Sequence, residues 1–272
     1  MFELLMFSSQ RERVAQAEDA GIHRIVVDLE ACDKHGRQVG FDTEITRQTL
    51  DDLAIVRGLT GLPIVCRINP VGPATVSEVE AVAARGADEI LVPMVRTVLE
   101  VGQVLEVAAG RVGVGVIVET RDAVANVADL AALPLTRIYV GLNDLHIDSG
   151  TRHIFAAVSD ETVDRVRASV GPIPFGFAGL TLPGGGAPLP VRHLIDEMAR
   201  LGCGFTFLRR SFFRDVCGHN LREAIQQILS AVERAARRPA LQVESDRRSA
   251  LAAIEQIPDP PWTSLYPAVQ PS

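Results

Sequence analysis

The sequence is almost without lysine: Lys34 is the only one, against 26 arginines in 272 residues. A Schiff-base mechanism needs a lysine whose amine is taken out of water. Lys34 lies in the polar stretch DKHGRQ, directly after an apolar run, which is a poor place to desolvate an amine. The scarcity of lysine therefore argues against covalent amine catalysis.

Cysteines are also few, and no two of the four form a CxxC pair. They stand far apart, at Cys32, Cys66, Cys203 and Cys217. Disulfide frameworks and structural zinc sites use paired or closely spaced cysteines. The N-terminus, MFELLMFSSQ, lacks the basic and long apolar regions of a secretion signal. These absences predict a reduced, cytoplasmic protein.

Long apolar runs and an excess of basic charge are missing as well. No run reaches the ~18 residues that a membrane span requires, and the net charge of −7 argues against nucleic acid or an anionic membrane as partner. No GxGxxG or Walker motif follows an early apolar run. The glycine-rich stretch 179–190 is interrupted by prolines, and we interpret it as a mobile loop, with a phosphate cradle as the alternative.

Short apolar runs alternate with helical patterns along the chain. The runs are continuous in Val, Ile and Leu, which is typical of parallel strands buried on both faces. Eight such strands, each followed by a helix, predict a (β/α)8 TIM barrel, with a doubly wound open sheet as the alternative. The expected strands are 3–7, 24–30, 63–69, 89–95, 112–120, 137–144, 174–180 and 205–210. The expected helices are 10–20, 43–59, 75–85, 97–109, 122–132, 160–170, 191–201 and 219–237.

The composition changes near residue 239, so we predict a barrel domain over 1–238 and an additional C-terminal helix and extended arm over 239–272. Residues 242–256 can form an amphipathic helix. The proline-rich end carries the only tryptophan, Trp262. We expect this arm to pack on its own barrel or on a neighbouring subunit, and a disordered tail is the alternative.

Polar side chains stand where four of the expected strands end. TIM-barrel active sites lie at these ends. The residues are Asp28, Glu30, Arg67, Glu119, Asn143 and Asp144. Two carboxylates from separate strands suit a hard cation such as Mg2+ or Mn2+, which keeps water and takes oxygen ligands from a substrate. An arginine beside them suits an anionic substrate and an enolate oxygen. The alternative is that the carboxylates only cap helices.

Five motifs occur in a familiar order across about residues 20–150. They are DLE (28–30), CRIN (66–69), GADEILVPMV (86–95), VIVET (116–120) and VGLNDL (140–145). Each motif alone is unspecific, but the ordered set resembles the HpcH/HpaI aldolase and citrate-lyase β-subunit family of the phosphoenolpyruvate/pyruvate barrel superfamily.

The resemblance implies a role for each strand-end residue. Glu119 and Asp144 match the two metal-binding carboxylates, with Mg2+, Mn2+ or another divalent cation as cofactor. Arg67 matches the arginine that contacts the keto or enolate oxygen. Asp28 and Glu30 match acidic residues that hold metal-bound waters or the surrounding loop. The backbone amides near Asn143 and Asp144 would receive the substrate carboxylate.

The sequence departs from the family pattern after Glu30. The pyruvate aldolases have a histidine at the next position and the lyase subunits have aspartate, whereas this chain has Ala31. His35, His146 or a metal-bound water are candidates for the missing base.

A second departure lies in FLRRSFFRD, which fits neither branch of the family. Arg209 and Arg210 could bind a second carboxylate or a phosphate at the barrel mouth. Alternatively, one faces a helix and the other solvent. Together with Arg214 they form the only basic group suited to a CoA thioester.

The resemblance implies a class II, metal-dependent aldolase or carbon–carbon lyase. It would act through a metal-bound enolate of pyruvate, oxaloacetate or a related 2-oxo acid, in a homo-oligomer (trimer or hexamer). Two alternatives stay open: an acyl-CoA lyase of the citryl- or malyl-CoA type, and a non-catalytic barrel subunit.

Overall fold

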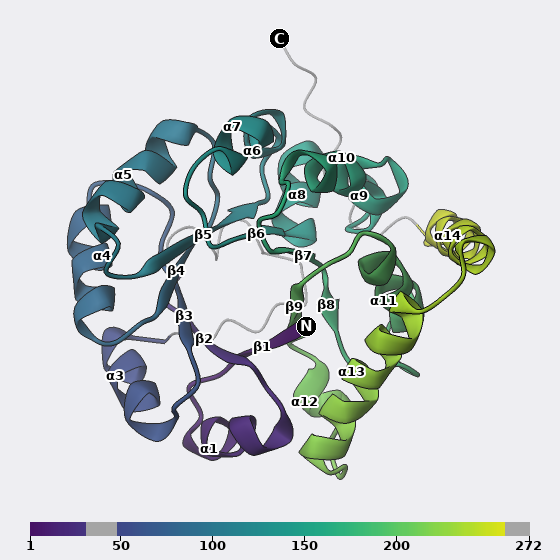
Figure 1. The fold of residues 1–272 in the computed structure, drawn as a ribbon, viewed down its shortest axis with the longest axis horizontal. Coiled ribbons are helices and arrows are strands. Elements are labelled where there is room, and N and C mark those ends of the chain that lie inside the picture. The colour runs from purple at the N-terminus through teal and green to yellow at the C-terminus, as the bar shows by residue number, and fades with distance from the viewer. Residues whose placement is uncertain (31–47, 259–272) are drawn as a thin grey trace.

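The computed structural model describes residues 1–30 and 48–258. Its strands are all parallel and form a nearly closed α/β barrel surrounded by helices (Figure 1), which confirms the predicted TIM-barrel fold. The strands follow the order β7-β6-β5-β4-β3-β2-β1-β9-β8. They are β1 (Glu3–Phe7), β2 (Arg24–Asp28), β3 (Ile64–Arg67), β4 (Glu89–Val92), β5 (Gly113–Val118), β6 (Arg137–Val140), β7 (Phe175–Phe177), β8 (Gly179–Leu180) and β9 (Phe205–Leu208).

The expected strand 174–180 is broken in two at Ala178, whose backbone is left-handed (φ 54°). Before the break, β7 pairs with β6, and after it β8 pairs with β9. A single stretch of chain therefore joins the two ends of the sheet. Gly176 is needed at this junction, because a Cβ there would lie 2.3 Å from the carbonyl oxygen of Phe205.

The helices lie on the outside of the barrel (Figure 1). They are α1 (Arg11–Ala20), α3 (Leu50–Leu59), α4 (Thr75–Ala84), α5 (Val98–Ala108), α6 (Arg121–Ala125), α7 (Val127–Ala131), α8 (Leu142–Ser149), α9 (Ala156–Ser159), α10 (Thr162–Ser169), α11 (Val191–Arg200), α12 (Phe212–Asp215), α13 (Leu221–Ala236) and α14 (Ala240–Glu255). The expected helix 122–132 is two short helices separated at Asn126. Residues 43–47 of the expected helix 43–59 lie outside the described residues, and α3 begins only at Leu50, because the preceding Thr49 is extended and caps the helix.

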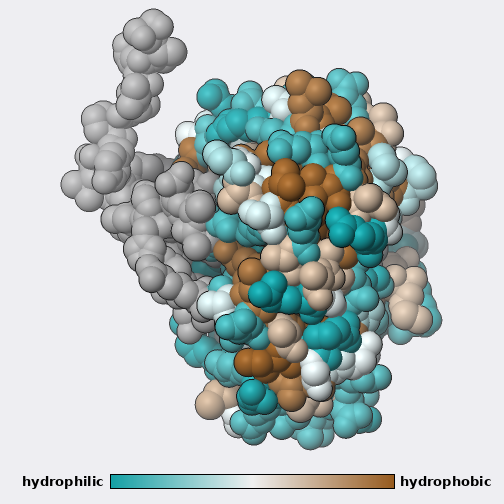
Figure 2. All heavy atoms as spheres, turned by 90° about the vertical axis from the view of Figure 1, so that its left-hand side faces the viewer, coloured by the Kyte–Doolittle hydropathy of each residue, from teal (hydrophilic) through white to brown (hydrophobic). Residues whose placement is uncertain are grey.

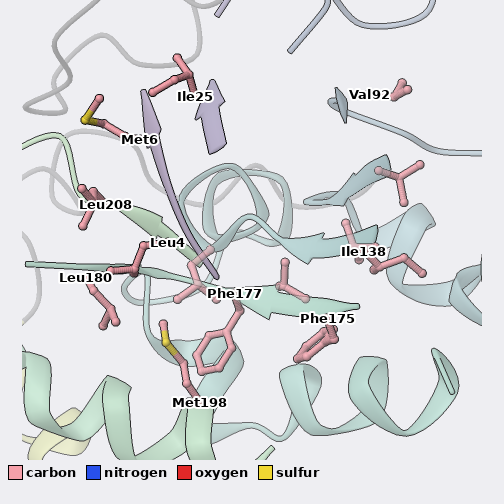
Figure 3. Close-up of a cluster of buried hydrophobic side chains, with 14 of the residues drawn as sticks. Leu4, Met6, Ile25, Val92, Ile138, Phe175, Phe177, Leu180, Met198 and Leu208 are labelled. Atoms are coloured by element: carbon pink, nitrogen blue, oxygen red, sulfur yellow. The ribbon is translucent and has the colours of Figure 1, made fainter. Parts of the chain in front are cut away.

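Strand residues are buried on both faces, as their continuous apolar runs predict. One set of side chains packs outward against the helices. Figure 3 shows part of it, with Met198 of α11 near Phe177 of β7. The other set fills the barrel interior and consists of Leu5, Val26, Val65, Leu91, Ile117, Phe205 and Phe207. The barrel is therefore a packed core whose free space lies at its two ends.

The C-terminal helix α14 packs beside α11. Ala250 and Ile254 are buried, and Arg238, just before α14, lies 2.7 Å from Asp196 of α11 and 2.5 Å from Asp246 of α14. The arm from residue 259 onward lies outside the described residues, so the division at 238/239 stays a prediction.

The outer surface mixes hydrophilic and hydrophobic side chains. Figure 2 shows this on the side that carries α4 and α5, where the exposed apolar residues include Val76 and Leu99. Within the described ranges, no helix has both the length and the apolar character to cross a membrane.

Candidate active site

A cavity of about 280 Å3 lies at the end of the barrel where the strands terminate. Four of the sequence-predicted residues line it: Arg67, Glu119, Asn143 and Asp144. Asp28 lines a smaller hollow of about 90 Å3, which shares several lining residues with the cavity. Because TIM-barrel active sites lie at this end, the cavity is the candidate active site.

Arg67 is the last residue of β3, and its guanidinium is held by two carboxylates. Strand register places Asp28 beside Arg67. Arg67 Nε donates to Asp28 Oδ1 at 2.9 Å and Nη2 donates to Oδ2 at 2.7 Å. Nη1 lies 3.1 Å from Glu30 Oε2. Burial alone would lower the pKa of Arg67, but Asp28 and Glu30 raise it overall. The result is a fixed, permanently charged guanidinium at the cavity wall.

Glu119 follows β5 directly and is buried. Its Oε1 accepts a hydrogen bond from the backbone N–H of Met94 at 2.8 Å. Its other oxygen packs over Gly141 on the neighbouring strand end. A Cβ at position 141 would lie 2.5 Å from Glu119 Oε2. Glycine at this position therefore makes the space that the carboxylate occupies.

The charges around Glu119 are unfavourable for a carboxylate. Burial raises its pKa well above the ordinary value, the charge of Asp144 raises it further, and Glu30 adds a smaller repulsion. Arg67 acts in the opposite direction but does not compensate. A cation between these carboxylates would remove the repulsion.

The structure corrects the expected strand 137–144. β6 ends at Val140, and Asn143 and Asp144 lie in the first turn of α8. Leu142 and Leu145 are buried on one side of this helix, which explains why the apolar pattern continues past the strand. N–H groups of a first helical turn have no intrahelical acceptor, and the helix dipole favours negative charge there. The predicted reception of a substrate carboxylate at Asn143 and Asp144 thus has a physical basis.

The donor set suits a hard divalent cation. Glu119 and Asp144 offer oxygen ligands only, as Mg2+ and Mn2+ prefer. Within residues 1–30 and 48–258, no three His, Cys, Asp or Glu side chains converge in a group that could hold an ion by themselves. An ion held by two carboxylates keeps coordination positions for water and substrate oxygen. The residues therefore fit the cation that the sequence implies.

The structure does not bring His146 to these carboxylates. It lines a separate hollow, with its Nδ1 3.0 Å from the hydroxyl oxygen of Thr151. Burial lowers its pKa, followed by the charge of His153. Ala31, Lys34 and His35 lie outside the described residues.

Several lining residues were missed in the sequence. Phe7, Tyr139 and Phe207 form an aromatic wall, with 4.5 Å between the ring centroids of Tyr139 and Phe207. The Tyr139 hydroxyl donates to the carbonyl oxygen of Ala178, and burial raises its pKa. A phenol inside an otherwise aliphatic strand was the available signal, because a buried tyrosine hydroxyl needs a partner.

The family model of the HpcH/HpaI aldolase/citrate lyase family matches residues 4–156. A comparison with curated proteins gives no match. Among solved structures, the chain is similar to RipC from Yersinia pestis, with 13% identity and a TM-score of 0.58, covering 89% of this chain and 98% of that one.

Two further solved structures are similar at the level of the fold. An HpcH/HpaI aldolase from Desulfitobacterium hafniense DCB-2 has 13% identity and a TM-score of 0.60, covering 88% of this chain and 94% of that one. CitE from Mycobacterium tuberculosis, solved in complex with magnesium and pyruvate, has 17% identity and a TM-score of 0.59, covering 91% and 98%. The family match spans more than half of the sequence, and the chain therefore belongs to the HpcH/HpaI aldolase/citrate lyase family.

Proposed function

We propose that the protein is a divalent-metal-dependent aldolase or carbon–carbon lyase that acts through the enolate of pyruvate, oxaloacetate or a related 2-oxo acid. One observation carries the proposal. The buried carboxylate of Glu119 and the half-buried carboxylate of Asp144 repel each other beside the fixed guanidinium of Arg67. The magnesium and pyruvate of the CitE structure lend support from a protein of the same fold.

Glu119 and Asp144 are the residues that would hold the cation. A divalent ion bound there would supply positive charge beside a 2-oxo acid and its enolate. The first turn of α8 would orient the substrate through N–H donors to its carboxylate. The aromatic wall of Phe7, Tyr139 and Phe207 lines one side of the cavity, and excluding water from that side would strengthen the electrostatic interactions inside it.

Arg67 would stabilise the negative charge that develops on the enolate oxygen. Guanidinium has five N–H donors in a planar fork, and two of them are donated to Asp28. Asp28 and Glu30 thus position Arg67 before the substrate binds, so that no reorganisation is needed during the reaction. His35 and a metal-bound water both stay predictions for the proton carrier.

The alternative of a non-catalytic barrel subunit is less well supported. Buried carboxylates that repel one another cost stability when no cation is present. A barrel without a ligand has no physical reason to keep Glu119 next to Asp144.

The first experiment is proton NMR of pyruvate in deuterium oxide with the protein and Mg2+ or Mn2+. We expect metal-dependent loss of the methyl signal, abolished by EDTA and in Glu119→Gln and Asp144→Asn. Asp122→Asn is the matched control, because Asp122 is exposed and paired with Arg96 at 2.8 Å. Absence of both exchange and metal binding, measured by calorimetry, would overturn the proposal.

We also propose that the arm beyond Pro258 contributes to a homo-oligomeric assembly. The part of α14 that packs on α11 is complete within the described residues. A chain truncated after Pro258 should therefore keep its fold but elute later in gel filtration than the full chain by more than its lost mass. An unchanged assembly would contradict this role.

A further inference from the structure

Arg209 stands between the candidate active site and the smaller hollow next to it, and it lines both. It follows β9 directly, where its N–H donates to the carbonyl oxygen of Leu180 at 2.8 Å. Its own carbonyl accepts from the N–H of Phe212 at 2.9 Å. The backbone that carries this guanidinium is therefore fixed on both sides.

The side chain of Arg209 passes over Gly179. A Cβ at position 179 would lie 3.1 Å from Arg209 Cγ. The half-buried stem of Arg209 is thus packed against the β8 backbone. Gly179 also lines the cavity. The path of the arginine is set by packing rather than by a counter-ion.

Within the described parts of the chain, no carboxylate forms an ion pair with Arg209. Burial lowers the pKa of Arg209, and the charge of Asp215 offsets this only in part. Asp215 is already engaged, since its Oδ2 accepts from Thr181 Oγ1 at 2.7 Å and from Ser211 Oγ at 2.9 Å. A cation partly removed from water without a paired anion is unfavourable unless a ligand supplies that anion.

The neighbouring arginines differ from Arg209 in this respect. Arg67 lies 2.7 Å from Asp28. Arg210 also lines the cavity, and the charges of Asp28 and Asp144 act on its guanidinium against that of Arg67. The carboxylates of the site therefore already attract two guanidinium groups. Among the described residues, Arg209 has no carboxylate within ion-pair distance.

Resting on the proposed enolate chemistry, we propose that Arg209 is a specificity-determining residue, which binds a carboxylate or phosphate at the far end of the electrophile. Glu119, Arg67 and Arg209 line the same cavity. The enolate and the anionic group of the electrophile would therefore lie in that one cavity. The guanidinium fork matches both carboxylate and phosphate oxygens. A volume of about 280 Å3 suits a small partner.

Two pairs of probes test this inference in pyruvate condensation with Mg2+. Glyoxylate is compared with acetaldehyde, and glyceraldehyde 3-phosphate with glyceraldehyde. We expect the wild-type enzyme to prefer the anionic member of at least one pair, and the pair identifies carboxylate or phosphate. In Arg209→Gln, kcat/KM for that anionic probe should fall about 10- to 100-fold relative to its neutral counterpart.

Arg192→Gln is the control, because Arg192 is exposed on α11 and outside the cavity lining. If Arg209→Gln fails to unfold cooperatively, Arg209→Lys replaces it and should give an intermediate preference, since lysine keeps the charge and loses the fork. An unchanged preference in a folded variant, or no anionic preference in the wild type, overturns the inference. If the wild-type enzyme shows no deuterium exchange of pyruvate, the proposed function itself is rejected instead.

Discussion

The two ends of the barrel both bury charged side chains, and they balance these charges differently. At the N-terminal end, Arg24 Nε donates to Glu3 at 2.8 Å and Arg137 Nε donates to Glu89 at 2.6 Å. Longer contacts of 3.7 Å join Arg24 to Glu89 and Arg137 to Glu3. Two guanidinium groups thus neutralise two carboxylates.

At the C-terminal end the carboxylates are in excess. Asp28, Glu30, Glu119 and Asp144 stand around Arg67, with Arg210 as a second cation. Arg209 lines the same cavity as a third cation, so one negative charge is uncompensated when all seven groups are ionised.

The pKa values express the same difference. Burial alone would raise the pKa of Glu3, but its hydrogen bond to Arg24 and the charge of Arg24 lower it overall. Burial and Asp144 together raise that of Glu119. The cavity at the N-terminal end is the larger one, at about 450 Å3 against about 280 Å3. Charge balance therefore distinguishes the end that holds the candidate active site better than cavity volume does.

Removing one guanidinium from the charge-balanced N-terminal end of the barrel should have the largest effect on stability. Arg137→Met leaves the buried Glu89 with the Thr136 hydroxyl at 2.6 Å but without its closest cation, and we expect a loss of ~3–5 kcal/mol in the free energy of unfolding. Urea titration measures it, with Arg121→Met as the control because Arg121 is 76% exposed. A loss below ~1 kcal/mol would show that the N-terminal network is dispensable.

Changing the geometry at the C-terminal end without changing its charge should affect activity more than stability. Arg67→Lys keeps one positive charge but loses the bidentate fork to Asp28. We expect kcat/KM for the condensation to fall ~10²- to 10³-fold. Arg85→Lys, which alters a helix-surface arginine, serves as the control. Near wild-type kinetics would mean that Arg67 acts as a simple point charge.

Filling the space at Gly141 should weaken the proposed metal site while leaving every donor in place. Alanine there would displace the Glu119 carboxylate, so we expect Mg2+ affinity to fall ~10- to 100-fold, as for changes that disturb the support of a ligand. Calorimetry measures the affinity. Gly102→Ala is a matched control, because a Cβ at position 102 meets only open space. Equal Mg2+ affinities of the two variants would argue against the site.

The smallest effect concerns pH and stability without metal. The pKa of Glu119 is raised above its ordinary value of 4.5. Above that value the folded state therefore binds more protons than the unfolded state, and stability falls as pH rises toward the folded-state pKa. Glu119→Gln should lack this decline. Its stability advantage over the wild type, measured by thermal unfolding at several pH values, should grow with pH and shrink when Mg2+ is added. Parallel curves would contradict the raised pKa.

Most of the barrel could be predicted because its strands are continuous apolar runs separated by helical patterns. The break at Ala178 could not, since a left-handed alanine has no sequence signature. The start of α8 was hidden because Leu142 extends the apolar run of β6. Strand and helix patterns are ambiguous over such short stretches.

Polar residues near the C-terminal ends of the strands were expected to lie close together, and Arg67, Glu119 and Asp144 do line one cavity. The same expectation does not find the ion pairs at the N-terminal end of the barrel, because Glu89 and Arg137 are the first residues of their strands. Their meeting depends on Gly115 of the strand between them, where a Cβ would lie 2.6 Å from Arg137 Cγ. Contacts across an intervening strand follow from register, which a single sequence does not reveal.

The pairing of the first strand, β1, with the last, β9, has a consequence for the order in which the barrel folds. Strands β1 to β7 each pair with the strand that precedes or follows them in the chain, whereas β1 and β9 pair across almost the whole barrel, as Leu5 does with Phe207. Ring closure therefore carries the greatest loop entropy. Glu119 and Asp144 follow adjacent strands, but Phe207 and Arg209 reach the cavity only through β9. We expect the carboxylate pair to form early during folding and the wall that faces the electrophile to be completed last.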